Sequence, residues 1–280
     1  MGTAHKAVFR SDQLRIEGAS RAGDRTWFRV HPPGLAFDVG RGALELTGSD
    51  QIFLTHGHLD HALGLPFVLS NRVMQGLGAT RVHCPIETRA ALEAFVEAAA
   101  ALERVEYDYS LQAMEPGDRV DVGRDFLVEA FAVDHGVPAL GYHLVRKAKS
   151  LAFEHRGLPG VRLAELRKKG VDISTERDDY WLSYCGDTSR RVFELEPRVF
   201  ESRVLLVECT FFDHSERERA PDYGHLHLED LVSLEDRFEN EAVILHHLTR
   251  RHRPDELRRA VDSRLPELAE RIHLLMVSEP

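Results

Sequence analysis

The stretch "IFLTHGHLDHALG", Ile52 to Gly64, places three histidines and an aspartate within six residues, directly after an apolar run. His56 and His58 stand two apart, so both side chains project from one side of an extended segment. Asp60 and His61 are adjacent, and their side chains diverge. This spacing predicts a strand that runs into a loop surrounding metal ions. The alternative is a solvated, histidine-rich loop, although H-x-H-x-D-H arises rarely by chance.

Composition indicates an ordinary globular protein, because 43% of the 280 residues are hydrophobic and 29% are charged. We find no linker, repeat or low-complexity run, so we expect a single domain over residues 1–280. We expect it to be cytoplasmic and independent of membranes, because it shows neither a signal-peptide core nor a long apolar run. Three cysteines without C-x-x-C spacing are predicted to be core residues: Cys84, Cys185 and Cys209.

Charge is unevenly distributed along the chain. The net charge of -10 argues against a protein that coats nucleic acid generally. Between Leu144 and Gly170, however, eight Lys and Arg residues stand against two acids. The sixteen histidines are a second anomaly, since histidine is the commonest metal ligand.

Short apolar segments alternate with helical patterns, which predicts an α/β or α+β layered fold. The expected strands are Leu14–Ile16, Trp27–Val30, Leu35–Asp38, Ile52–Leu54, Arg81–Cys84, Phe126–Val133, Leu140–Val145, Trp181–Tyr184, Val204–Val207, Ala242–Leu245 and Ile272–Val277. The expected helices are Ile86–Leu102, Leu163–Lys169, Leu226–Phe238 and Asp255–Asp262.

Four donors are too many for one closed site with an open position, so the motif predicts two ions and further ligands. His135 follows one expected strand, and taken alone it is more often structural. Asp187 follows another, where a helix N-cap is an equal alternative. His246 and His247 end a third, where a core or surface histidine is the safer single interpretation. Together they favour a shared site, because each follows an apolar strand as His56 does.

This order of motifs resembles the metallo-β-lactamase fold, an α+β, four-layer αβ/βα sandwich with a dinuclear metal site. Within it, the chain is similar to ribonuclease Z, the endonuclease that removes 3′ trailers from precursor transfer RNA, and most of all to its short plant-type form. The resemblance rests on "AFDVGR", "DHGVPALGYHL", "YCGDTS", "LLVECTFFD", "DYGHLHLEDL" and "RFENEAVILHHLTRRH", and it extends over nearly the whole chain.

The resemblance implies two divalent ions, expected to be zinc, with manganese or iron as alternatives. It implies the metal ligands His56, His58 and His135 for one ion, Asp60, His61 and His247 for the other, and Asp187 as a bridge between them. Such ions lower the pKa of a bound water, so that hydrolysis needs no serine or cysteine nucleophile.

The resemblance also implies three catalytic residues. Asp60 would orient the attacking water as a general base. His225 would protonate the leaving 3′ oxygen, and Glu208 would orient His225. A surface position at a helix start is the alternative for His225. His227 and His246 are expected to be structural or to support the ligands.

Two departures from the family concern the substrate. After His247 the family commonly reads Phe-Ser-x-Arg-Tyr, whereas this chain reads "LTRRH", in which only Arg251 keeps its place. The segment of about residues 144–175 stands where other members carry a longer RNA-gripping arm. Its basic residues from Arg146 to Lys169 are expected either to contact precursor tRNA or to form a solvated basic helix. The resemblance further implies a homodimer.

Three other classes of function stay open at this stage. A small-molecule metallo-hydrolase acting on cyclic nucleotides, lactones or thioesters would use the same scaffold. An iron oxidoreductase is less favoured, because both Asp60 and His61 are present and no carboxylate replaces His58. A non-catalytic binding module is disfavoured, because a buried cluster of this kind is costly without metal.

Overall fold

The computed structural model describes residues 6–275, and within them the strands form two seven-stranded sheets. The first sheet has the order β1 (Ala7–Arg10), β2 (Arg15–Arg21), β3 (Arg25–His31), β4 (Leu35–Phe37), β5 (Gln51–Phe53), β6 (Thr80–Pro85) and β7 (Tyr109–Met114). The second has the order β14 (Ile272–Leu274), β13 (Ala242–His246), β12 (Val204–Glu208), β11 (Ser174–Tyr184), β10 (Leu140–Leu151), β9 (Phe126–Ala132) and β8 (Arg119–Val122).

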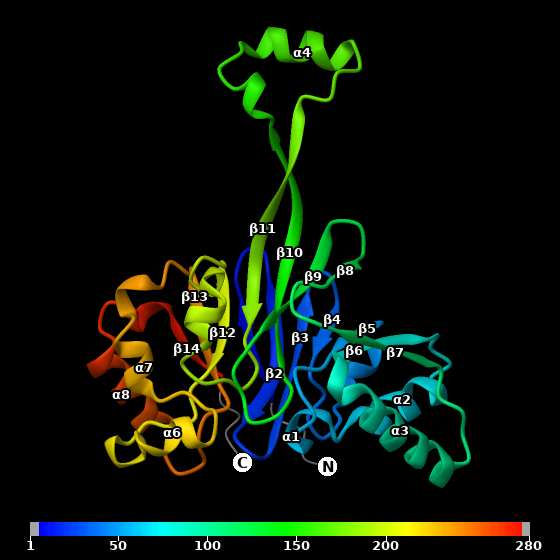
Figure 1. Cartoon of the computed structure of the whole chain (residues 1–280), viewed down its shortest axis with the longest axis vertical. Helices are drawn as coiled ribbons and strands as arrows, with labels where there is room; N and C mark the ends of the chain where they lie inside the picture. Colours follow the sequence, from blue (N-terminus) through cyan, green and yellow to red (C-terminus); the bar gives the residue numbers. More distant parts are fainter. Residues whose placement is uncertain (1–5, 276–280) are drawn as a thin grey trace.

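Helices cover the outer faces of both sheets (Figure 1). The α-helices are α1 (Leu59–Ala62), α2 (Leu65–Met74), α3 (Arg89–Glu103), α4 (Gly160–Lys168), α5 (Val192–Leu195), α6 (Arg219–Asp222), α7 (Leu228–Val232) and α8 (Pro254–Arg264). Short 3-10 helices are η1 (Leu44–Gly48), η2 (Ile86–Thr88), η3 (Phe153–His155), η4 (Pro197–Phe200), η5 (His214–Glu216), η6 (Glu235–Arg237) and η7 (Ala269–Arg271). No helix in residues 6–275 is long and apolar enough to cross a membrane.

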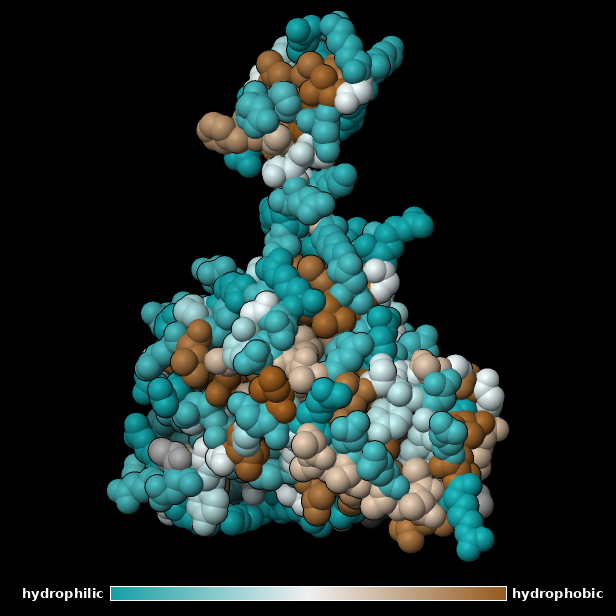
Figure 2. All heavy atoms as spheres, turned by 45° about the vertical axis from the view of Figure 1, so that its right-hand side comes forward, coloured by the Kyte–Doolittle hydropathy of each residue, from teal (hydrophilic) through white to brown (hydrophobic). Residues whose placement is uncertain are grey.

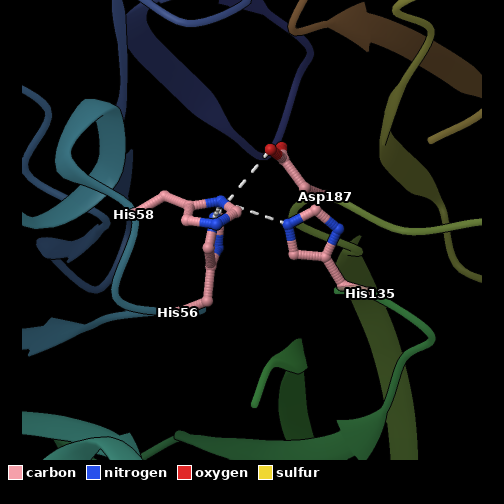
Figure 3. A group of neighbouring side chains, drawn as sticks. All are labelled: His56, His58, His135 and Asp187. Atoms are coloured by element: carbon pink, nitrogen blue, oxygen red, sulfur yellow. Dashed lines mark hydrogen bonds and ion pairs between the residues drawn. The ribbon is translucent and has the colours of Figure 1, made fainter. Parts of the chain in front are cut away.

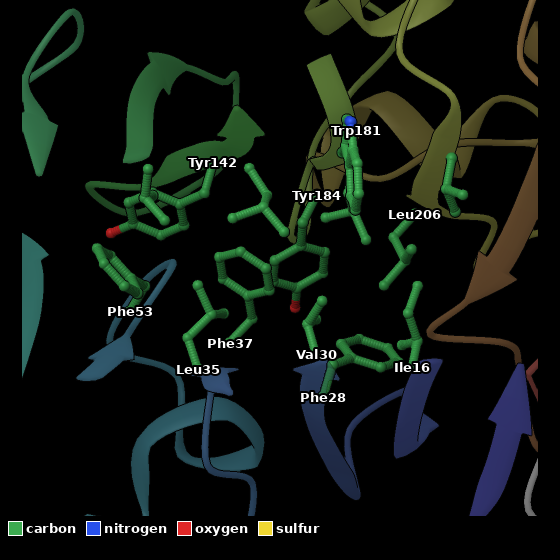
Figure 4. Packing of buried hydrophobic residues seen from close by; sticks show 14 of the residues in the cluster. Ile16, Phe28, Val30, Leu35, Phe37, Phe53, Tyr142, Trp181, Tyr184 and Leu206 are labelled. Carbon is green, nitrogen blue, oxygen red and sulfur yellow. The ribbon is translucent and has the colours of Figure 1, made fainter. Parts of the chain in front are cut away.

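The central core lies between the two sheets. Phe28 and Phe37 of the first sheet pack against Tyr142 and Tyr184 of the second, and all four are buried (Figure 4). Two further clusters fill the space between each sheet and its helices. This arrangement is the four-layer αβ/βα sandwich that the sequence predicts, with an apolar face buried at every layer.

Some predicted elements differ from the observed ones. Leu226–Phe238 is not one helix, because α7 ends at Val232 and the chain turns so that Phe238 packs edge-on against Phe200, with ring centroids 5.0 Å apart. Tertiary packing here overrides helical periodicity. The strands β1, β7 and β8 lack a predicted counterpart, because most of their residues are only partly buried or exposed. Predicted Ile272–Val277 extends outside the described residues, and β14 ends at Leu274.

The strands β10 and β11 continue far beyond their predicted apolar cores. They leave the body as a two-stranded stalk and carry η3 and α4 at its tip (Figure 1). The stalk is covered by hydrophilic side chains (Figure 2). Its pairing runs from Tyr142 opposite Tyr184 to Leu151 opposite Ser174. The basic segment around residues 144–175 therefore forms an arm that projects from the sandwich.

Candidate metal centre

The ligand candidates lie where strands of the two sheets end. In the second sheet, β9, β11, β12 and β13 run in one direction, so their carboxyl ends share an edge. His135 follows β9, Asp187 follows β11, and His247 follows β13. Facing them, His56 follows β5 of the first sheet. A backbone hydrogen bond of 2.9 Å from the Leu140 amide to the Thr55 carbonyl joins the sheets there.

The strand β5 ends at Phe53, and His56 and His58 lie in the loop after it, as the spacing predicts, whereas Asp60 and His61 lie in one helical turn, α1. The carbonyl of His58 accepts hydrogen bonds from the amides of His61 and Ala62, at 3.0 and 2.9 Å. This closes α1 and turns Asp60 and His61 toward a common point, with His61 Nε2 3.9 Å from Asp60 Oδ2. The helical turn thus directs toward one site two side chains that would diverge in an extended chain.

The first candidate group joins three imidazoles and one carboxylate (Figure 3). His58 Nδ1 lies 3.0 Å from His56 Nε2 and 3.3 Å from His135 Nε2. Asp187 Oδ2 lies 3.9 Å from His56 Nε2. His56 and Asp187 are buried, whereas His58 is exposed, so the group opens to solvent on one side.

The second group consists of Asp60, His61 and His247, and Asp187 lies between the two groups. Asp60 Oδ2 lies 3.3 Å from His247 Nε2. The two oxygens of Asp187 face different histidines, with Oδ1 3.4 Å from His61 Nε2 and Oδ2 3.2 Å from His247 Nε2. Asp187 is therefore placed to serve both groups.

These separations fit metal coordination. Zinc binds imidazole nitrogen at about 2.0–2.1 Å with tetrahedral geometry, which places neighbouring donor atoms about 3.3 Å apart. The distances from His58 Nδ1 to His135 Nε2 and from His247 Nε2 to Asp60 Oδ2 are both 3.3 Å. Moreover, His61 Nε2 and Asp187 Oδ1 are buried without a hydrogen-bond partner among the described residues. A divalent cation would satisfy both orphaned atoms.

Electrostatics within the cluster also favours a cation. Burial opposes protonation of His61, but the carboxylates of Asp187 and Asp38 outweigh it and raise the pKa of His61 well above its ordinary value. Burial would likewise raise the pKa of Asp187, but His247 and His61 hold that pKa well below its usual range. The buried carboxylates thus attract positive charge to the position that a metal ion would take.

An outer set of hydrogen bonds orients the imidazoles. Thr55 Oγ1 lies 2.9 Å from His56 Nδ1, and Thr210 Oγ1 lies 2.9 Å from His247 Nδ1. The carbonyl of Gly224 accepts from His135 Nδ1 at 3.0 Å. Because Nδ1 of each of these three histidines has an outer partner, their Nε2 atoms are left to face the site. Thr55, Thr210 and Asp38 are not among the predicted site residues. Each lies just after the end of a strand, and Asp38 and Thr210 also belong to the motifs "AFDVGR" and "LLVECTFFD" on which the resemblance rests.

The backbone at two of these positions adopts an unusual conformation. Asp38 and His247 have φ angles of 52° and 53°, in the left-handed region that non-glycine residues rarely occupy. Such conformations cost on the order of 1–3 kcal/mol and concentrate at functional sites. Gly186, with φ of 60°, lies so close to Thr55 that an added Cβ would approach its side chain to 2.9 Å. A glycine is therefore required there for Asp187 to reach the first sheet.

His225 and Glu208 form a pair beside the cluster. His225 Nδ1 lies 2.6 Å from Glu208 Oε1, and its ring stacks on His247 with centroids 5.1 Å apart. Burial opposes protonation of His225, but Glu208 outweighs it and raises the pKa of His225 to about 9. Glu208 also accepts from the Thr188 amide at 3.1 Å and from the Thr210 hydroxyl at 2.6 Å. Its carboxylate is therefore held rigidly.

His227 and His246 lie outside the ligand groups. His227 is the N-cap of α7, and its Nδ1 accepts from the Glu229 amide at 3.0 Å. His246 is buried between Phe28 and Tyr184, with ring centroids 5.4 and 5.3 Å away. The three cysteines are buried and free, as predicted for core residues.

Comparison with known proteins places this site in a family. Residues 33–248 match the family model described as the beta-lactamase superfamily domain. The chain is 30% identical to tRNase Z TRZ1 of Arabidopsis thaliana over 273 residues, covering 96% of this chain and 98% of that protein. It is 28% identical to ribonuclease Z of Staphylococcus aureus strain MSSA476, covering 79% of this chain and 80% of that protein.

Solved structures agree at the level of the fold. The metallo-β-lactamase fold protein YhfI from Bacillus subtilis superposes with a TM-score of 0.65 at 14% identity, covering 96% of this chain and 98% of that one. The short form of human tRNase Z superposes with a TM-score of 0.57 at 17% identity, covering 98% and 95%. On the family match and the 30% identity along nearly the whole chain, this protein belongs to the metallo-β-lactamase superfamily and, within it, to the ribonuclease Z (tRNase Z) family.

Proposed function

We propose that this chain is a metal-dependent endoribonuclease that removes 3′ trailers from precursor tRNA. The observation that carries the proposal is the combination of two ligand groups sharing Asp187 with a His225–Glu208 pair beside them. This arrangement suits phosphodiester hydrolysis, in which a positioned water attacks and a positioned acid protonates the leaving oxygen. The named relatives are tRNase Z and ribonuclease Z proteins, which supports this substrate.

We propose two zinc ions as the cofactors. The first would be held by His56, His58 and His135, the second by Asp60, His61 and His247, with Asp187 shared between both. When bound, such ions act as Lewis acids that activate water and neutralise phosphate charge. The donor set of imidazoles and carboxylates suits zinc and also accepts manganese or iron.

Asp60 is suited to orient and deprotonate the attacking water. Burial would raise its pKa, but the hydrogen bond from His247 and the charge of His61 outweigh burial and lower it. The carboxylate is therefore ionised at neutral pH. The Gly23 amide donates to Asp60 Oδ2 at 3.0 Å, which fixes the side chain from the β2–β3 turn.

His225 is suited to protonate the leaving 3′ oxygen. Because Glu208 raises its pKa to about 9, the ring carries a proton at neutral pH. Its Nδ1 is occupied by Glu208, so Nε2 is the nitrogen left to donate. Attack then breaks the bond between phosphorus and the 3′ oxygen, and the proton from Nε2 completes the new 3′ hydroxyl group.

The projecting arm is proposed to contact the tRNA away from the cut. We propose that residues 1–280 form one hydrolase domain from which this arm extends. Its tip carries four exposed cations on or next to α4, namely Arg162, Arg167, Lys168 and Lys169. Cationic side chains at the tip can bind RNA phosphates, and the release of counterions from the RNA favours this binding.

We propose that the protein forms a homodimer through the surface of α1 and α2. Leu59, Phe67 and Met74 are 64%, 47% and 73% exposed there. Large exposed apolar side chains on two consecutive helices suit an interface. Replacement of Phe67 by Glu should give a monomer in sedimentation equilibrium, whereas an unchanged mass would contradict the proposal.

The function is tested with zinc-loaded protein and a 3′-extended tRNA. Cleavage directly after the mature 3′ end supports the proposal. Structured tRNA should also inhibit hydrolysis of bis(p-nitrophenyl) phosphate at low salt and lose this effect at high salt. Intact precursor together with rapid hydrolysis of the small diester would overturn the proposal in favour of a small-molecule hydrolase on the same scaffold.

A further inference from the structure

A basic, aromatic pocket lies directly beside the His225–Glu208 pair. It has a volume of about 370 Å³, within the range of about 300–1,000 Å³ that is typical of small-ligand sites. His225 and His247 form its inner wall, so it is continuous with the candidate metal centre. The residues of its outer wall belong neither to the ligand groups nor to the His225–Glu208 pair.

The outer wall combines positive charge with exposed aromatic surface. Arg219, Arg250 and Arg251 line it, and no acidic residue does. The ring of Phe211 lies 6.2 Å from that of His225 and 6.4 Å from that of Tyr223, centroid to centroid.

These rings therefore lead outward from the proton donor to the surface. Tyr223 is 56% exposed, and the guanidinium of Arg219 lies 5.5 Å from its ring centroid. Ring faces beside arginines are the features with which proteins bind unpaired nucleotides, by stacking on the base and pairing with the phosphate.

A second cavity beside the centre has a different character. It adjoins His135, whose ring centroid lies 5.3 Å from that of His225, and is lined by Glu87 and Glu115, with no Lys or Arg in its wall. Two carboxylates disfavour an approaching phosphate. Of these two cavities beside the centre, the one next to His225 is thus the one suited to an anionic nucleotide.

We infer that this pocket binds the nucleotide whose 3′ oxygen is the leaving group, stacking its base on Tyr223 and holding its 5′ phosphate with Arg219 and Arg250. The inference rests on the proposed function, because His225 must reach the leaving oxygen. That oxygen belongs to the last nucleotide of the tRNA product. Its nucleoside therefore lies on the His225 side, and the trailer leaves on the other.

The stretch after His247 supplies part of this wall. Thr249, Arg250 and Arg251 of "LTRRH" line the pocket. Arg251 keeps the place of the arginine in Phe-Ser-x-Arg-Tyr, and Arg250 stands at its variable position, so Thr249 is the lining residue that differs. The two neighbouring arginines add positive charge to the wall next to His247.

The test uses Tyr223→Ala and Tyr223→Phe in zinc-loaded, full-length protein, with precursor tRNAs that carry one abasic nucleotide either directly before or directly after the cut. Removing a stacking ring typically weakens binding by about 5- to 150-fold per base. We expect Tyr223→Ala to lower kcat/KM on the intact precursor about tenfold or more, and Tyr223→Phe to restore it. With an abasic nucleotide directly before the cut there is no base to stack, so Tyr223→Ala should no longer lower kcat/KM. With an abasic nucleotide directly after the cut, Tyr223→Ala should still lower it.

Matched controls separate the outcomes. Arg219→Ala should raise KM for precursor tRNA, whereas Arg259→Ala, an exposed arginine on α8 paired with Asp255, should not. If wild-type protein leaves the precursor intact, the proposed function fails. If it cleaves the precursor but Tyr223→Ala has no effect, or its effect disappears with the abasic nucleotide after the cut, the pocket assignment fails and the proposed function stands.

Discussion

Asp38 holds His61 through a hydrogen bond of 2.8 Å between its Oδ2 and the imidazole Nδ1. The same carboxylate accepts from the Tyr184 hydroxyl at 2.5 Å and from the Thr55 amide at 2.7 Å. Asp38 and His61 are both completely buried. One carboxylate from the end of β4 thus connects both sheets and directs His61 Nε2 toward Asp187.

Asp38→Asn should therefore weaken metal binding without removing a ligand. Outer partners of this kind typically contribute about 10- to 100-fold in metal affinity, because they fix the tautomer and orientation of the ring. Competition with a chromophoric zinc chelator measures the change. Asp121→Asn, at an exposed carboxylate paired with Lys147, is the control. Equal zinc affinity in both variants would show that Asp38 has no role at the centre.

Substitutions at the adjacent histidines His246 and His247 should have different effects on metal content. His247→Ala removes a proposed ligand, so the metal content should fall from the proposed two ions to about one per chain. Both ring nitrogens of His246 are buried and lack partners among the described residues, so His246→Leu should keep the metal and increase stability by about 1 kcal/mol. Elemental analysis and urea unfolding measure the two effects. Loss of metal in His246→Leu would contradict the assignment.

Glu208→Gln should change the pH dependence of catalysis. Glu208 raises the pKa of His225 against the opposing effect of burial, so the ring keeps its proton into the alkaline range. Without the carboxylate the pKa of His225 falls, and the alkaline limb of kcat should move to lower pH. His225→Ala should lower kcat by about 10²–10⁴. An alkaline limb in Glu208→Gln that coincides with that of wild type would exclude His225 as the acid.

His83 should make the fold sensitive to mild acid. It is buried on Phe53, with ring centroids 4.3 Å apart, and burial lowers its pKa to about 4. Unfolding exposes it to its ordinary pKa of about 6.5, so the unfolded state binds the proton first as pH falls. Stability is therefore lost from about pH 6.5 toward pH 4, by about 2 kcal/mol at pH 5.

His83→Phe keeps a ring on Phe53 but cannot bind a proton. Urea unfolding of both proteins at pH 8 and pH 5, under identical metal conditions, isolates the contribution of His83. The variant should lose about 2 kcal/mol less than wild type between these pH values. Equal losses of stability in the two proteins would mean that His83 is already protonated in the folded protein at pH 5.

The basic tip of the arm should control the salt dependence of tRNA binding. Simultaneous replacement of Arg167, Lys168 and Lys169 by Ala removes three cations from the end of α4. Each lost phosphate contact lowers the slope of log K against log salt by about 0.7–0.9, so a reduction of about 2–3 is expected. Filter binding of precursor tRNA at several salt concentrations measures it. An unchanged slope would show that these three residues do not contact tRNA phosphates and that α4 is a solvated basic helix.

Apolar strands that are buried on both faces were predictable from local sequence alone. Val204–Val207 and Ala242–Leu245 are continuous apolar runs, and both lie within central parallel strands. In contrast, the stalk of β10 and β11 beyond Arg146 carries polar residues without an apolar face. Its strands form because each supplies the hydrogen bonds of the other, and that pairing joins residues such as Lys149 and Glu176 that are distant in sequence.

The sequence by itself determined the donor types and their positions after strands, because burial of parallel strands and metal preference are local chemistry. Tertiary structure decided which atom of each side chain faces the centre. His58 presents Nδ1, whereas His56 and His135 present Nε2, since Thr55 and Gly224 occupy their other nitrogens. Hydrogen bonds between residues distant in sequence set that choice, and no local pattern encodes them.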